Sequence, residues 1–141
     1  MGRFVGTIFC LLGSAVVSVG QVNFPVGEAD IVAMQLMHYY SPDNKFHEVD
    51  FEWSFKKGTF TLKKGKAEIP ADLQKKLLPD GKTAEEIEGK WSLKDGKLVL
   101  SEIKAGSTEG RKDVSMEVYK TAPTVVRIGY GAPQYAFVVK K

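Results

Sequence analysis

Two stretches of the 141-residue chain share one pattern, which constrains the fold more than any other feature of the sequence. "WSFKKGTFTL" begins at Trp53, and "WSLKDGKLVL" begins at Trp91. In each, apolar residues alternate with polar ones on both sides of a Lys-x-Gly turn, which is typical of strands with one face in a core. Asp95-Gly96 is also a strong signal for a two-residue hairpin. We interpret both stretches as β-hairpins rather than as a duplicated functional motif.

The same alternation predicts strands elsewhere in the chain. The predicted strands cover residues 47–55, 59–62, 67–69, 87–93, 97–103, 114–119, 125–130 and 135–139. Residues 29–40 are apolar on all sides and fit either a buried first strand, which we favour, or a helix capped by Asp30. Seven or eight antiparallel strands joined by short turns predict a mainly β fold, either an up-and-down barrel or a strongly curved meander.

One segment departs from the strand pattern. "PADLQKKLLPDG" offers Pro70 at a helix start, leucines at helical spacing, and a Pro-Asp-Gly stop at 79–81. Thr83 and Glu86 then have the spacing of a capping box, which favours a further helical turn. We therefore predict one short helical insertion over residues 70–88.

The N-terminus has the layout of a secretory signal peptide over residues 1–20. A basic Arg3 precedes an apolar run from about Ile8 to Val19, and small residues stand just before a cut at Gln21. An uncleaved membrane anchor is the alternative, but the apolar run is short for a span of about 20 residues. We expect cleavage, a single β-barrel domain over 21–141, and a secreted or periplasmic location.

Several classes of chemistry find no support in the sequence. Cys10 is the only cysteine and lies in the predicted signal peptide, so the mature chain would have no thiol nucleophile or sulfur ligand. His38 and His47 are the only histidines, and they lack the fixed ligand spacing of a metal site. No catalytic motif and no phosphate-binding glycine loop is present, and a net charge of +3 does not indicate a nucleic-acid partner. We expect no enzymatic activity, no metal and no cofactor.

Aromatic residues give the best indication of a ligand. Many of them fall on the apolar faces of the predicted strands, where they either fill the barrel interior or line one ligand cavity. If a cavity exists, the candidate ligand-binding residues are Trp53, Phe55, Trp91 and Tyr130, and the ligand is a small apolar molecule.

Lysines in the turns provide an alternative function. Lys56, Lys57, Lys63, Lys64 and Lys66 form a basic run without an intervening acid. Such a run could contact an anionic surface of the cell envelope. Lysines in turns also discourage aggregation between sheet edges, which is the simpler interpretation.

The chain resembles the small lipocalin-like proteins exported by bacteria. The resemblance rests on "FEWSFKKGTFTL", "PADLQKKLLPDG", "GKWSLKDGKLVL" and the closing "YAFVVKK", which together span roughly residues 45–141. It implies a lipocalin-like β-barrel and brings no catalytic residues with it.

Overall fold

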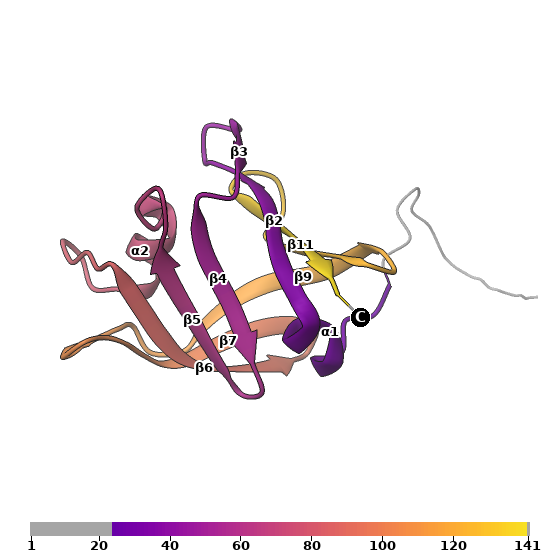
Figure 1. Ribbon diagram of the computed structural model, residues 1–141. Helices are drawn as coiled ribbons and strands as arrows, with labels where there is room; N and C mark the ends of the chain where they lie inside the picture. Colours follow the sequence, from indigo (N-terminus) through magenta and orange to yellow (C-terminus); the bar gives the residue numbers. More distant parts are fainter. Residues whose placement is uncertain (1–23, 141) are drawn as a thin grey trace, which may run out of the picture.

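The computed structural model describes residues 24–140, so the predicted signal peptide lies outside the described residues. Within them the chain forms one ten-stranded antiparallel sheet and two short helices (Figure 1). The helices are α1 (Glu28–Ala33) and α2 (Ala71–Leu77). The strands are β2 (Met34–Tyr40), β3 (Phe46–Glu48), β4 (Phe51–Lys56), β5 (Thr59–Lys64), β6 (Glu86–Lys94), β7 (Lys97–Ala105), β8 (Thr108–Glu109), β9 (Val114–Ala122), β10 (Val125–Ile128) and β11 (Gln134–Val139). The predicted mainly β architecture is confirmed.

The strand order is that of a curled meander. Along the sheet it runs β3-β2-β11-β10-β9-β7-β6-β5-β4, with β8 paired to β7 beside this path. The last strand, β11, therefore pairs with the first long strand, β2. The curl brings β2 beside β4 (Figure 1), but the ladders of the described chain do not join them. The result is a half-barrel with one open seam between β2 and β4.

Both tryptophan hairpins form as predicted. In the first, Trp53 lies opposite Leu62, and in the second, Trp91 lies opposite Leu100. All four side chains are buried on the concave face. There the apolar side chains, which occupy alternate positions along each strand, pack into one core. Asp95 and Gly96 both have positive φ, 53° and 77°, as a type I′ turn requires.

The ambiguous segment 29–40 contains both of the structures considered for it. Its first part is α1, and its second part is β2. The Asp30 carboxylate accepts a hydrogen bond from the Gly27 backbone N–H at 2.9 Å, which stabilises the first turn. The favoured prediction of a strand is wrong for α1, so residues 24–140 contain two short helices rather than one.

The helical insertion is shorter than predicted. Only α2 is helical, and the further turn expected after Thr83 is absent from this described segment. Pairing with β5 explains the difference, because the Lys64 backbone N–H donates to the Glu85 carbonyl at 2.8 Å and holds this segment extended. Glu86 then pairs with Lys63 as the first residue of β6.

The strand predicted over 47–55 is interrupted. β3 ends at Glu48 and pairs with β2, whereas β4 starts at Phe51 and pairs with β5. Val49, predicted to face the core, is 44% exposed because it lies between strands with different partners. The alternating pattern therefore predicted β4 correctly, but it also predicted a strand at Val49 and Asp50, which connect β3 to β4.

The two helices lie at opposite ends of β4 (Figure 1). α1 is tied to β9 by an ion pair of 3.2 Å between the largely buried Asp30 and Lys120 side chains. α2 is tied to β11 by a hydrogen bond from the Tyr135 hydroxyl to Asp72. Neither helix within residues 24–140 has the length and apolar character that crossing a membrane demands.

Candidate functional site

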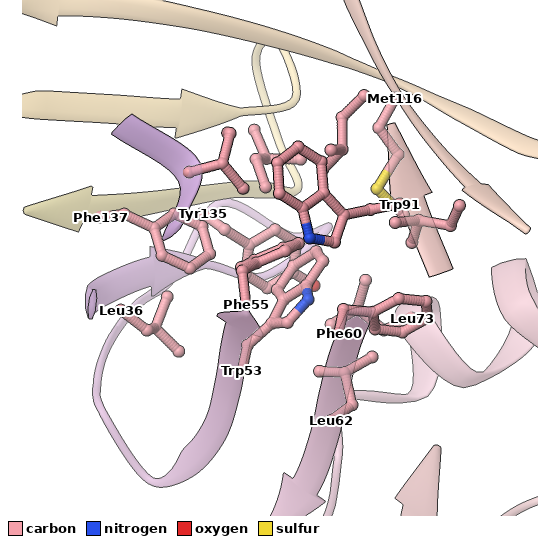
Figure 2. Close-up of a cluster of buried hydrophobic side chains, with 14 of the residues drawn as sticks. Leu36, Trp53, Phe55, Phe60, Leu62, Leu73, Trp91, Met116, Tyr135 and Phe137 are labelled. Atoms are coloured by element: carbon pink, nitrogen blue, oxygen red, sulfur yellow. The ribbon is translucent and has the colours of Figure 1, made fainter. Parts of the chain in front are cut away.

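Three of the four predicted ligand-binding residues meet inside the half-barrel. Trp53 and Phe55 come from β4, and Trp91 comes from β6 (Figure 2). Phe55 lies between the two indoles, with its ring centre 5.6 Å from that of Trp53 and 6.2 Å from that of Trp91. Their exposed fractions are only 2% for Trp53, 4% for Phe55 and 6% for Trp91, so alternation identified the interior correctly.

β11 completes this aromatic cluster from the opposite direction. The ring centres of Tyr135 and Phe137 lie 5.4 Å and 5.6 Å from Trp53, and both contacts are edge-to-face. Such contacts are favourable because the positive ring edge meets the negative ring face. Sequence reasoning placed both residues on an apolar face, but nothing local indicated that β11 would lie against β4.

The two indole N–H groups differ in their hydrogen bonding. Nε1 of Trp91 donates to the backbone carbonyl of Lys56 at 2.6 Å. Nε1 of Trp53 is buried without a partner, and it is the only such side-chain atom found within residues 24–140. A buried donor left without an acceptor costs about 1–3 kcal/mol, so the aromatic interior contains one unused polar group.

Two tyrosine–aspartate pairs border the aromatic cluster near α2. The Tyr39 hydroxyl donates to Asp50 at 3.0 Å, and the Tyr135 hydroxyl donates to Asp72. The two tyrosine rings stack with their centres 5.5 Å apart. Burial, followed by the hydrogen bond to the aspartate, raises the pKa of each tyrosine well above its ordinary value. Both hydroxyls therefore stay protonated and act as donors at neutral pH.

Tyr130 does not belong to this interior, contrary to the prediction. β10 ends at Ile128, so Tyr130 lies in the following loop rather than on a strand face. It is 59% exposed and stacks on Tyr119 with ring centres 4.5 Å apart. Gly129 and Gly131, with φ of +94° and +70°, turn the chain here and interrupt the alternation that had suggested a strand.

The histidines take part in aromatic contacts. His47 stacks on Tyr39 at 4.8 Å, and His38 lies 5.2 Å from the ring of Phe46. Burial, and then the nearby positive charge of Arg127, lowers the pKa of His38. A search of residues 24–140 finds no group of three or more His, Cys, Asp or Glu side chains arranged to hold a metal.

The lysine-rich turns do not form one basic patch. Lys56 ends β4 and Lys57 follows it in the turn, whereas Lys64 lies at the far end of β5. Lys64 is also engaged by acids, since its Nζ lies 3.2 Å from Glu85 and 3.8 Å from Glu68. The hydrogen bond to Glu85 raises the pKa of Lys64. The second lysine group is therefore partly neutralised within the chain.

Comparisons with known proteins find likeness in fold alone. No protein-family model matches the chain, and no curated protein matches it. A lipocalin-like protein from Bacteroides uniformis is similar with 19% identity and a TM-score of 0.49, over 79% of this chain and 99% of that one. An uncharacterized protein from Bacteroides eggerthii is similar with 18% identity and a TM-score of 0.46, over 79% of this chain and 100% of that one.

Proposed function

We propose that this protein is an exported, non-enzymatic lipocalin-like binding protein whose interior takes up a small, mainly apolar molecule with one hydrogen-bond acceptor. The observation that carries the proposal is the unpaired Nε1 of Trp53 inside a cluster of aromatic rings. An acceptor on the ligand would pair with this N–H and remove the cost of leaving it unsatisfied. Mostly apolar walls with a single directing polar group are typical of sites for small hydrophobic molecules.

The seam between β2 and β4 provides the route of entry. β4 is an edge strand of the sheet, so its movement breaks no ladder hydrogen bonds with β2. The Tyr39–Asp50 hydrogen bond spans the seam, and opening the seam requires this bond to break. We propose that the ligand enters here and separates Trp53 on β4 from the Tyr135 ring on β11.

The polar groups nearest the interior support binding rather than catalysis. A general base needs a pKa near the working pH, whereas Tyr39 and Tyr135 have pKa values raised far above it. Asp50 and Asp72 accept hydrogen bonds from these hydroxyls and hold the rings in place. In this proposal the four residues shape the end of the site and perform no chemistry.

Nuclear magnetic resonance of the indole N–H groups tests the interior site directly. The chain has two tryptophans, so its spectrum has two indole signals, and Trp91 serves as an internal control. Titration with the neutral ester methyl laurate should shift the Trp53 signal strongly, because its N–H gains an acceptor. The Trp91 signal should move little, since Lys56 already accepts its hydrogen bond.

Trp53→Phe sharpens this test. The variant removes the unpaired donor and should weaken methyl laurate binding by about 5- to 10-fold, the value of one hydrogen bond. Native mass spectrometry of the protein from its own host should then show a bound small molecule that the variant retains poorly. An empty wild-type protein, together with two unmoved indole signals, would overturn the proposal.

A further inference from the structure

Two grooves indent the outer surface of the sheet, and they differ in the charged side chains that line them. The larger one, of about 1040 Å³, lies over β5, β6 and β7. Two of its lysines pair with lining acids, since Lys90 lies 3.3 Å from Glu102 and Lys104 lies 3.7 Å from Glu88. The smaller groove, of about 680 Å³, contains the guanidinium group of Arg127.

The smaller groove lies on the outer face of β2, β9, β10 and β11. Arg127 on β10 stands opposite Tyr119 on one side and Ala136 on the other, and Ala136 stands opposite His38. Residues opposite each other in a ladder share a face, so these four form one row across the outer surface. Of this row, Tyr119 and Arg127 line the groove, whereas Ala136 is only 1% exposed.

A chain of hydrogen bonds fixes the Arg127 guanidinium. Nη1 of Arg127 donates to the Gln134 side-chain oxygen at 2.7 Å, and Nε2 of Gln134 lies 2.9 Å from the Tyr119 hydroxyl. That hydroxyl donates to the Gly129 carbonyl at 3.1 Å, and the Tyr130 ring covers the Tyr119 ring. Arg127 is thus held in place before any ligand binds, which lowers the entropic cost of recognition.

Arg127 has no acidic partner within the described chain. The ion pairs found among residues 24–140 leave its guanidinium without a carboxylate, although it is only partly exposed. After burial, its positive charge is the second cause of the lowered pKa of His38 on the same face of the sheet. A fixed guanidinium with free N–H donors matches the geometry of a carboxylate.

The remaining lining fits a ligand rich in hydroxyl groups. The groove is lined by Tyr40, Asn44, Thr121 and Gln134, whose side chains both donate and accept hydrogen bonds. The ring of Tyr40 supplies flat apolar surface beside these polar groups. Flat rings suit the apolar face of a sugar, mixed donors and acceptors suit its hydroxyls, and Arg127 suits a carboxylate.

We propose that this outer groove binds an acidic saccharide, with the carboxylate of one sugar on Arg127 and the sugar ring beside Tyr40. The volume of the groove is in the range of sites for ligands of several rings. The site is separate from the aromatic interior, since Arg127 and Trp53 lie on opposite faces of the sheet. It also gives the exposed Tyr130 a role, which is to support the Tyr119 ring from outside.

Calorimetric titration with trisaccharides of galacturonate, glucuronate and mannuronate tests this proposal. At least one of them should bind with a dissociation constant of about 1 mM or tighter, and the matched neutral trisaccharide should bind at least about 10-fold more weakly. Arg127→Gln should weaken binding by about 10- to 100-fold, the value of a charge-assisted pair. Arg127→Lys should lose part of the affinity, because it keeps the charge but not the planar geometry.

Two controls make the result decisive. Lys104→Gln removes the same charge from the larger groove and should leave saccharide binding unchanged. The two indole signals show whether each variant keeps its fold, and Trp53→Phe should bind the saccharide normally. Failure of all three acidic trisaccharides to bind at about 10 mM overturns the proposal, as do equal losses in Arg127→Gln and Lys104→Gln.

Discussion

The two tryptophan hairpins have nearly the same sequence pattern but different positions in the sheet. β4 and β5 lie at its edge beside the seam, whereas β6 and β7 lie in its interior. Nε1 of Trp91 reaches across to the first hairpin and finds the carbonyl of Lys56, but Nε1 of Trp53 finds no partner. The pattern determines which way a side chain faces, and the neighbours in the sheet determine whether its polar group is satisfied.

The largest expected difference between the hairpins concerns the second apolar position of each. Phe55 is 4% exposed within the aromatic cluster, whereas the matching Leu93 is only partly buried. Phe55→Ala should lower the free energy of unfolding by about 3–5 kcal/mol, because it leaves a cavity among packed rings. Leu93→Ala should cost about 1–2 kcal/mol. Urea unfolding measures both, and equal losses would mean that the two hairpins are equally buried in solution.

The losses of stability caused by the two Trp→Phe changes should differ by the free energy of about one hydrogen bond. Both Trp→Phe changes remove similar volume, but Trp91→Phe also leaves the Lys56 carbonyl without its donor. Trp91→Phe should therefore destabilise the ligand-free protein by about 1–2 kcal/mol more than Trp53→Phe. Thermal and urea unfolding of the two variants give this difference. A larger loss for Trp53→Phe would show that its N–H has a partner in the free protein.

The turns of the two hairpins should respond differently to proline. In the first turn only Gly58 has positive φ, at 79°, whereas in the second both Asp95 and Gly96 do. Proline requires a φ near −65°, so Asp95→Pro should destabilise the protein by about 1 kcal/mol or more. Lys57→Pro should change the free energy of unfolding by less than about 1 kcal/mol in either direction. Urea unfolding decides whether the turns differ in solution as they do here.

The smallest effect at neutral pH concerns Tyr135, which contacts Trp53 but not the second hairpin. Its pKa is raised above the ordinary 10.0 by burial and by Asp72. The unfolded chain therefore loses this proton first, so stability stays level below about pH 10 and falls as pH rises further. Tyr135→Phe should flatten the fall measured between pH 9 and pH 11. A slope identical to that of the wild type would contradict the proposed environment of Tyr135.

Local sequence signals identified most strands because alternation is a local property. β5, β6, β7, β9, β10 and β11 all begin within one residue of the positions that the pattern indicates. The errors came where partners distant in sequence intervened. Residues 85 and 86 pair with β5 where a helical turn was expected, and β3 pairs with β2 instead of continuing into β4.

The candidate site was predictable only in part. Trp53, Phe55 and Trp91 occupy apolar positions of the alternating pattern, which is visible in the sequence, and all three are buried together. The same alternation placed Tyr130 on the apolar face, but the glycines on either side of it turn it outward. The Arg127 groove gave no sequence signal, because its residues come from four strands and from the loops that contain Asn44, Gly131 and Ala132, and they meet only in the folded chain.

The sequence by itself determined the strands, the hairpins and the inward direction of the aromatic residues, since these depend on the period-two geometry of a strand. Only the tertiary structure decided that β11 would lie against β4 and that the seam beside β4 would stay without a ladder. It also decided that Trp53 would keep an unpaired N–H while Trp91 would not. A buried polar group pairs with the residues that the curvature of the sheet brings near it, and no local pattern specifies that curvature.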